Sequence, residues 1–159
     1  MKQQEILNKL QLNSQNQDFT NKFENLKIEN LELSNLKLAS NYFINCELIN
    51  LKVTNCNFNG ALFSYTTFKN CIFKACCFIK TDFFVTEWKA KNTKFINCDF
   101  RYGDSFFEDI KDCTFTDCNF SSLTLSDLTI INSTFNQIQV DESTIFRNIA
   151  EDNVTWDFA

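Results

Sequence analysis

Eight cysteines are the residues of this 159-residue chain with the most obvious chemistry. Cysteine thiolates bind zinc when short, fixed spacings bring two pairs together. Here the close cysteine spacing is five residues, from Cys71 to Cys76 and from Cys113 to Cys118. This spacing is the length of the repeat described below, and small, buried cysteines are common in protein cores. We therefore expect no metal site and interpret all but Cys77, which is expected to face outward, as core residues.

The composition of the chain does not favour catalysis by general acids and bases. The chain has no histidine, which removes the commonest general base and the commonest metal ligand. Adjacent carboxylates occur at Glu108–Asp109 and Glu151–Asp152, but no cleft is implied and such pairs are usually solvated. No glycine-rich phosphate loop and no basic–aromatic patch for single-stranded nucleic acid is present. We expect a protein that is not an enzyme, has no cofactor and binds no nucleic acid.

A five-residue repeat must position these side chains. Steps of five from Phe23 to Trp88, and again from Phe95 to Ile145, pass through 25 positions, of which only Ser105 is not apolar. Five residues advance an α-helix by about 500°, and an odd step on a flat strand alternates between its faces. Neither element keeps such a pattern on one side. A chain that turns about once per repeat does, because every centre then points to a common axis.

The residues that flank each centre fit such a turn. Seven cysteines occupy the position two before a centre: Cys46, Cys56, Cys71, Cys76, Cys98, Cys113 and Cys118. Asparagine is frequent two after a centre: Asn25, Asn30, Asn35, Asn45, Asn50, Asn55, Asn70, Asn97 and Asn132. Because asparagine tolerates unusual backbone angles and bonds locally to the main chain, we expect it at the corners.

Segments 56–60 (CNFNG) and 118–122 (CNFSS) resemble the pentapeptide-repeat family, whose consensus is small–Asp/Asn–Leu/Phe–any–any. The resemblance extends over residues 21–149. It implies an all-β fold, a right-handed quadrilateral β-helix with four pentapeptides per coil and about six coils. At a strand spacing of roughly 4.8 Å, such a rod is about 30 Å long. The same geometry stacks Cys56, Cys76, Cys98 and Cys118 in one inward column.

The two ends depart from the repeat. Residues 1–20 are expected to form an N-terminal cap with a short helix, because Ile6, Leu7 and Leu10 have helical spacing. Residues 150–159 lose the repeat but keep Trp156 and Phe158. These two residues either close the last coil or join two subunits end to end as a homodimer. Members of the pentapeptide-repeat family, which this chain resembles, often dimerise through this end.

Two irregularities interrupt the repeat. The register slips by two residues, which we place across Lys89–Lys94 as a bulge or small loop that is either a recognition feature or a tolerated insertion. Further on, Gly103 and Ser105 offer little inward volume, and Glu108 falls at a nominally inward position. An unpaired buried carboxylate is costly, so either the coil distorts or Glu108 turns outward.

Charge is distributed unevenly along the chain. Residues 1–94 hold 12 Lys/Arg against 8 Asp/Glu (net +4), and residues 95–159 hold 3 against 12 (net −9). Acidic surface residues in the second half are Asp99, Asp104, Asp109, Asp112, Asp117 and Asp127. This half disfavours nucleic acid and favours basic partners, or it only maintains solubility. Without a signal sequence or an apolar run of about 20 residues, and with eight cysteines, we expect a cytoplasmic protein that does not enter a membrane.

One wall of the predicted four-sided coil collects apolar side chains. Its residues are Tyr42, Ile44, Leu62, Tyr65, Phe84, Val85, Phe106 and Phe107. A contiguous exposed apolar surface marks a binding site. The alternatives are that the N-terminal segment or a second copy covers this aromatic wall.

The resemblance therefore implies a non-enzymatic, protein-binding β-helix of one of two kinds. The first is a DNA-mimicking modulator of a type II topoisomerase (gyrase). The acidic second half fits this role, whereas the basic first half and the short rod fit it only if a dimer joins two acidic ends. The second is an interaction scaffold or an immunity or effector-associated module that docks through the aromatic wall.

Overall fold

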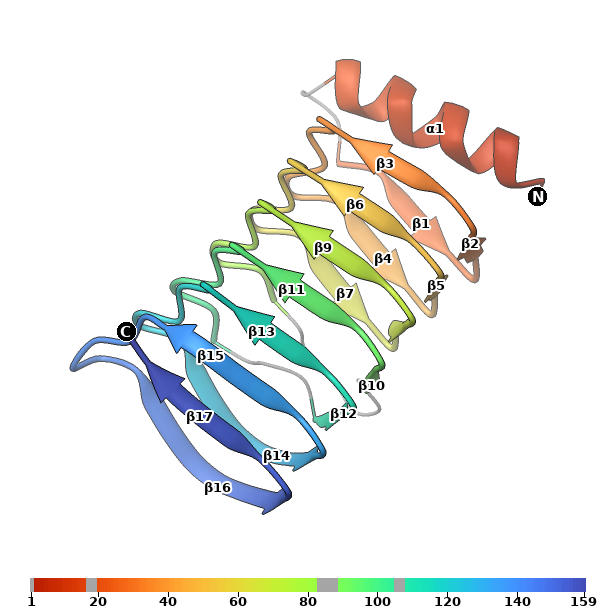
Figure 1. Cartoon of the computed structure of the whole chain (residues 1–159). Helices are drawn as coiled ribbons and strands as arrows, with labels where there is room; N and C mark the ends of the chain where they lie inside the picture. Colours follow the sequence, from red (N-terminus) through yellow and green to blue (C-terminus); the bar gives the residue numbers. More distant parts are fainter. Residues whose placement is uncertain (1, 17–19, 83–88, 105–107) are drawn as a thin grey trace.

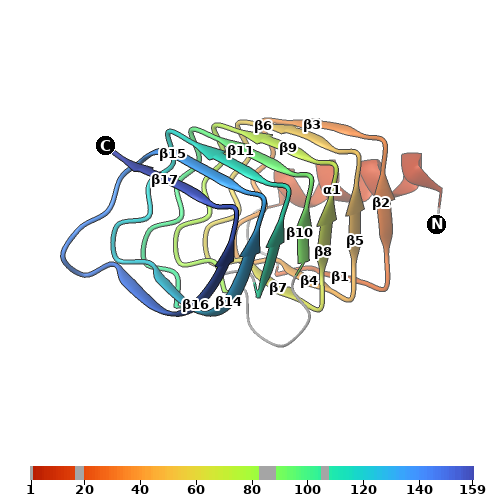
Figure 2. The ribbon, with the colours of Figure 1, turned by 60° about the horizontal axis from the view of Figure 1, so that its bottom comes forward.

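The computed structural model describes residues 2–16, 20–82, 89–104 and 108–159. They form one helix, α1 (Gln3–Gln15), followed by a stack of parallel strands (Figure 1). The chain winds as a right-handed, four-sided β-helix of about six coils, which confirms the predicted fold. Figure 2, which views the stack more nearly along its axis, shows the coils lying one behind another.

Three sides of the coil carry sheets, numbered here in the order in which the chain meets them. The first sheet contains β1 (Lys22–Glu24), β4 (Tyr42–Ile44) and β7 (Leu62–Ser64). The second contains β2 (Lys27–Glu29), β5 (Glu47–Ile49), β8 (Thr67–Lys69), β10 (Lys89–Lys91), β12 (Asp109–Lys111), β14 (Thr124–Ile131) and β16 (Ile145–Asp152). The third contains β3 (Glu32–Ser34), β6 (Lys52–Thr54), β9 (Ile72–Lys74), β11 (Lys94–Ile96), β13 (Thr114–Thr116), β15 (Thr134–Ile138) and β17 (Thr155–Phe158). The fourth side is joined by single bridges, such as Asn57 to Cys77 and Cys77 to Asp99.

Phenylalanine rings fill the interior in columns. Phe73, Phe95, Phe115 and Phe135 stack with ring centroids 5.1, 4.8 and 4.8 Å apart. This interval equals the strand spacing, so the repeat of the backbone and the thickness of the rings match. The rings are almost fully buried, as is a second column formed by Phe58, Phe78 and Phe100. The predicted convergence of the repeat centres on one axis is therefore confirmed.

Asparagine makes the corners, as predicted. All nine asparagines expected there have φ between 48° and 57°, the left-handed region that asparagine tolerates better than most residues. The corner side chains also bond along the stack, which the sequence analysis did not foresee. After the second sheet, Asn50 Nδ2 donates to Asn30 Oδ1 (2.9 Å) and Asn70 Nδ2 to Asn50 Oδ1 (3.1 Å). Asn30, Asn50 and Asn70 thus combine a tolerated backbone geometry with a hydrogen-bonded partner in a neighbouring coil.

Helix α1 covers the first coil, so the expected capping helix is confirmed. Ile6 and Leu10 are each 1% exposed. Gln3 bonds to β2 through both side-chain atoms: Nε2 donates to Lys27 O and Oε1 accepts from Glu29 N, each at 2.9 Å. At this end the helix supplies the apolar cover that another coil would otherwise provide.

The two-residue slip does not lie at Lys89–Lys94, where the sequence analysis placed it. Asp82 bridges Leu62 twenty residues earlier, whereas Lys89 pairs with Thr67 twenty-two residues earlier. The extra residues therefore precede Lys89, within segment 83–88, which lies outside the described residues. Lys89–Lys91 is a regular strand, and Ala90 fills the inward position in register with Phe68.

The register also changes near the C-terminus. Leu125 pairs with Phe146, so one residue is inserted after Gln139, which still bridges Asn119 in the twenty-residue register. The predicted centre Ile145 is consequently wrong, because it pairs with Thr124 and is 49% exposed. Val140 follows Gln139 directly and so keeps the register of the centre Phe120, although it is 38% exposed in the last coil. The predicted boundary between residues 149 and 150 falls inside β16, so residues 150–159 continue the sheets. At the other irregularity, Gly103 is buried and Glu108 is half-buried, whereas Ser105 lies outside the described residues.

Candidate functional site

The C-terminal end of the stack leaves the core uncovered. Among the described residues, β16 and β17 form the last coil (Figures 1 and 2). Trp156 stacks on Phe135 at 3.8 Å and contacts Phe146 and Phe158 at 5.5 and 5.8 Å between ring centroids. Phe146 and Phe158 remain 42% and 47% exposed. We call Phe146, Trp156 and Phe158 the end cluster.

A cavity of about 420 Å³ opens beside the end cluster. Its walls include Arg147 and Glu151 as well as the three rings. Glu151 stands in register with the buried Ile130 of the coil below, and its Oε1 accepts a hydrogen bond of 2.8 Å from Trp156 Nε1. The end of the rod therefore combines exposed aromatic surface with one cation and one anion.

Sequence reasoning named Trp156 and Phe158 but missed Phe146. It assigned the repeat centre to Ile145, which keeps an uninterrupted step of five. The sequence nevertheless contains a signal for Phe146. Phe146 and Trp156 are ten residues apart, which is two repeats, so a repeat centre at Phe146 makes Trp156 a repeat centre as well.

Half of the aromatic wall lies within the described residues. Tyr42 pairs with Leu62 on neighbouring strands of the first sheet, and Ile44 lies on the same strand as Tyr42. These three side chains are half-buried, whereas Tyr65 is 48% exposed. Tyr42, Ile44 and Leu62 thus lie on β4 and β7, and Tyr65 occupies the corner that follows β7. Phe84, Val85, Phe106 and Phe107 lie outside the described residues.

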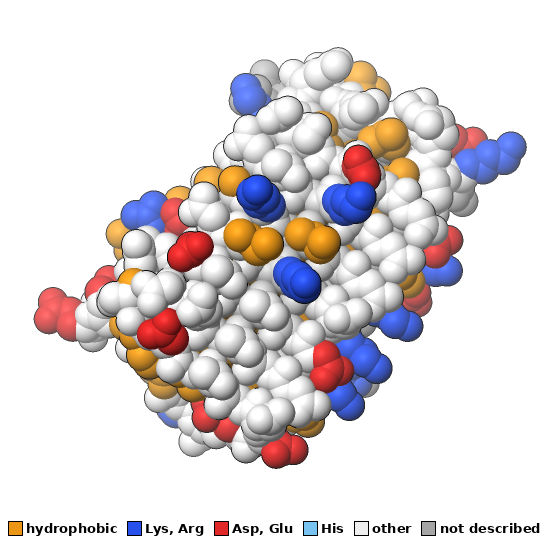
Figure 3. All heavy atoms as spheres, viewed as in Figure 1, with side chains coloured by type: hydrophobic (Ala, Val, Ile, Leu, Met, Phe, Trp, Pro, Cys, Tyr) orange, Lys and Arg blue, Asp and Glu red, His pale blue; other side chains and the backbone are white. Residues whose placement is uncertain are grey.

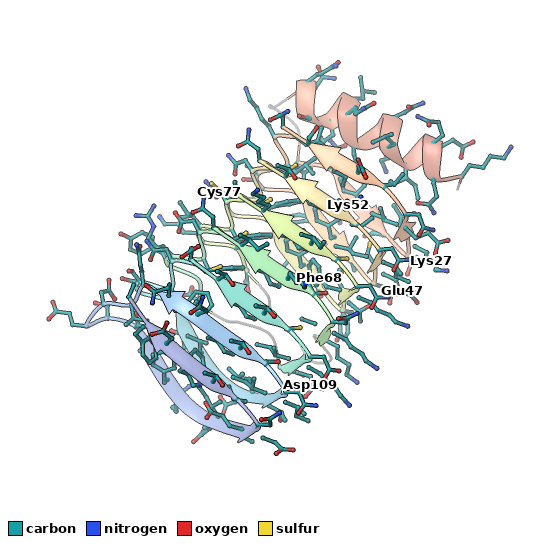
Figure 4. The ribbon with its side chains drawn as sticks, viewed as in Figure 1. Lys27, Glu47, Lys52, Phe68, Cys77 and Asp109 are labelled. Carbon is teal, nitrogen blue, oxygen red and sulfur yellow. The ribbon has the colours of Figure 1, made fainter. Side chains whose placement is uncertain are left out.

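The six acidic residues named from the sequence are distributed around the rod. Asp99 lies on the fourth side and pairs with Arg101 (Oδ2 to Nη2, 2.7 Å). Asp109 projects from the second sheet, as Figure 4 shows. Asp112, Asp117 and Asp127 occupy corners with φ of 52–57°, and Asp104 is exposed next to Gly103. Asp127 lies 3.9 Å from Arg147. The six do not form one continuous stripe.

The cysteines are all free thiols, and seven are buried. Burial raises the pKa of Cys56 and of Cys113 to about 11. The hydrogen bond between the Cys76 and Cys98 thiols raises the pKa of Cys76 further, as expected for neighbours in one inward column. Cys77 lies on the outer side of the fourth wall but is half-buried (Figure 4), and burial raises its pKa as well. None of these shifts favours a reactive thiolate at neutral pH.

The described part of the chain contains no set of three or more His, Cys, Asp or Glu side chains placed to hold a metal ion. Within the same residues, no helix has the length and apolar character needed to cross a bilayer.

The face formed by the third sheet has two distinct halves. Figure 3 shows basic and hydrophobic side chains gathered over β6, β9 and β11, with mostly uncharged polar surface beyond them. The outward residues there are Lys52, Ile72, Lys74, Lys94 and Ile96. Lys52 lies opposite Glu32 on the neighbouring strand, and its Nζ forms an ion pair of 2.8 Å with Glu32 Oε1.

Comparison with known proteins agrees with this architecture. Residues 42–78 match the family model for pentapeptide repeats, with 8 copies. No curated protein sequence matches the chain.

Similar solved structures include the pentapeptide-repeat protein Rfr23 from the cyanobacterium Cyanothece 51142 (12% identity, 95% of this chain and 99% of that chain, TM-score 0.45). They also include HetL from Nostoc sp. strain PCC 7120, involved in heterocyst differentiation regulation (11% identity, 92% and 78%, TM-score 0.45). A third is QnrB1, a plasmid-mediated fluoroquinolone resistance protein (17% identity, 85% and 81%, TM-score 0.38). The five-residue spacing, the four-sided coils and the family match together identify pentapeptide repeats in this chain.

Proposed function

We propose that this protein is a non-enzymatic, protein-binding β-helix that associates through its C-terminal end, with a second copy of itself as the partner. The observation that supports this proposal is the difference between the two ends. At the N-terminal end, α1 buries Ile6 and Leu10 over the first coil. At the other end, Phe146 and Phe158 are nearly half exposed.

The physical argument rests on what an open coil exposes. The end of a β-stack presents both core side chains and unpaired backbone groups, which favour pairing with another chain. A second copy brings an identical apolar end, and its Glu151 and Arg147 provide each charge of the cavity with an opposite charge across a two-fold axis. Such a contact is closed and stops at two subunits.

Replacement of Phe146 and Phe158 together by aspartate tests the proposal. We expect the wild-type protein to sediment as a dimer at tens of micromolar and the double variant to sediment as a monomer. Loss of two aromatic anchors weakens an interface by at least about a hundredfold in Kd. The wild-type dimer should tighten as salt rises, because the exposed acids of the last coil that have no opposite charge across the axis repel one another: Asp141, Glu142, Asp152 and Asp157.

A matched control places the same two aspartates on exposed apolar residues elsewhere. Tyr65, at the corner after β7, is 48% exposed, and Ile72, on the third sheet, is 38% exposed. Replacing both by aspartate should leave the dimer intact. A wild-type protein that is monomeric at 100 µM (about the upper end of a specific weak contact), or equal weakening by both double variants, would overturn the proposed association.

The more specific form of this proposal is a DNA-mimicking modulator of gyrase. It is favoured by the exposed acids of the last coil, because a dimer joined at this end would bring two such sets together. A supercoiling assay with titrated protein checks it. We expect the wild type to inhibit gyrase at micromolar concentration and the Phe146→Asp, Phe158→Asp variant to lose that inhibition. No effect of the wild type would remove the gyrase role while leaving the self-association test unaffected.

The aromatic wall supports the other form, an interaction scaffold or an immunity or effector-associated module. Four of its residues support this form: Tyr42, Ile44 and Leu62 on β4 and β7, and the exposed Tyr65 at the corner after β7. Docking through the complete wall stays a prediction, as does a cytoplasmic location for a protein with eight free thiols.

A further inference from the structure

Three lysines occupy directly paired positions on neighbouring strands of the second sheet. Lys91 of β10 is paired with Lys69 of β8 on one side and with Lys111 of β12 on the other. Paired strands lie about 4.8 Å apart, so the three exposed side chains start from one straight row. We call Lys69, Lys91 and Lys111 the lysine ladder. In the described part of the chain, none of them forms an ion pair.

This arrangement differs from the other charges on the rod. At the paired positions Glu32 and Lys52, opposite charges meet at 2.8 Å. Lys27 forms an ion pair of 2.8 Å with Glu29, two residues along the same strand. Like charges directly opposite each other destabilise a sheet, and the lysine ladder contains two such contacts in succession. Nothing within the ladder row offsets them, because its next members are Ile49 on one side and Ile131 on the other.

A groove runs beside the ladder. Its volume is about 220 Å³, and its polar lining consists of Lys89, Lys91, Asp109, Lys111 and Thr129, with Ile131 at one end. Ala90 and Ile110, whose side chains point inward, contribute its floor. Around the corner on the third sheet, the basic surface continues through Lys74 and Lys94, in the region of Figure 3 where basic and hydrophobic side chains gather.

We propose that the lysine ladder and this groove bind an acidic, extended segment of a partner protein. Carboxylates of the segment would lie between the ammonium groups and remove the repulsion that the free protein carries. This surface lies along one side of the rod and is separate from the end cluster, so the inference does not rest on the proposed self-association.

The surroundings of the ladder favour a peptide over a nucleic acid. No aromatic side chain projects outward from β8, β10 or β12, so there is no platform on which bases could stack. Asp109 is paired with Lys89 inside the groove, and the exposed Asp112 follows Lys111 at the corner. These carboxylates would repel a continuous row of phosphates. A peptide, in contrast, brings backbone N–H groups that can donate hydrogen bonds to them.

Fluorescence anisotropy with a labelled octaglutamate peptide tests this inference. The wild-type protein should bind it saturably, and binding should weaken as salt rises. Conversion of all three ladder lysines to glutamate should weaken binding at least about tenfold. The control triple variant carries the same charge change at exposed lysines elsewhere on the rod, Lys22→Glu, Lys37→Glu and Lys80→Glu, and should bind within about twofold of wild type.

Lys91→Glu alone provides a second readout that does not depend on the peptide. It creates a Lys–Glu–Lys row, so Tm should rise by about 2 °C or more while peptide binding weakens. Equal loss in both triple variants, or a lower Tm for Lys91→Glu, would refute the ladder as a site. Tighter binding of a labelled 16-base-pair DNA duplex or of phosphatidylserine vesicles than of the peptide would refute the partner class.

Discussion

Replacement of Phe95 by alanine should lower the free energy of unfolding by about 3–5 kcal/mol. Phe95 is 1% exposed and stacks between Phe73 and Phe115 at 5.1 and 4.8 Å. It also contacts Phe100 edge-on at 5.4 Å. Coils lie above and below it, so the walls of the resulting cavity cannot collapse without moving strands that are hydrogen-bonded in register. Urea denaturation followed by circular dichroism measures the loss.

Two controls separate the cavity from other effects. Lys94→Ala alters an exposed residue on the same strand and should change stability by no more than about 0.5 kcal/mol. Phe146→Ala removes a ring of the same size at the open end, where it is already 42% exposed, and should have a much smaller effect than Phe95→Ala. A loss below about 1 kcal/mol for Phe95→Ala would contradict the close packing described here.

The interior of this fold is predictable from sequence because a solenoid repeats one local environment. A residue at a repeat centre meets the same neighbours in every coil, so the spacing of apolar residues alone identifies the core. The corners follow for the same reason: Asn30 and Asn132 occupy the same corner five coils apart and have φ of 56° and 48°. In such a fold the short-range pattern and the long-range contacts carry the same information.

Insertions are harder to place, because apolar residues on either side of a slip satisfy the pattern equally well. Trp88 continues the step of five from Phe83, so the apolar pattern extends through Trp88 and predicts the slip across Lys89–Lys94. The structure instead gives the inward position to Ala90. Near the C-terminus, Ile145 and Phe146 are both acceptable centres, and only strand pairing distinguishes them.

The position of the slip determines which outward side chains lie next to each other in adjacent coils. If the slip lay across Lys89–Lys94, a twenty-residue step would align Lys69 with Lys89, and Lys91 would fall outside the row of paired lysines. The lysine ladder emerges only in the observed register, in which Lys91 pairs with Lys69 and Lys111. Outward side chains carry no apolar periodicity of their own, so their neighbours in adjacent coils depend entirely on where the insertions lie.

The cap at the N-terminal end should determine whether association stops at two subunits. Replacing Ile6 and Leu10 by aspartate puts two carboxylates where both side chains are 1% exposed, so α1 should detach from the first coil. Phe23, which lies fully buried at this end, would then be uncovered. A rod with two open ends can add further subunits at both, and we expect the double variant to form species larger than a dimer that grow with concentration.

Sedimentation velocity distinguishes this outcome from simple unfolding. Asn8→Asp with Leu12→Asp adds the same charge to exposed positions of the helix and should remain a dimer, since Leu12 is 60% exposed. Combining Ile6→Asp and Leu10→Asp with Phe146→Asp and Phe158→Asp leaves one associating end, so assembly should stop at two subunits again. If the cap variant keeps its β-sheet circular dichroism and still sediments as the wild type does, α1 is not what limits assembly. Growth in the combined variant would instead locate the contact away from both ends.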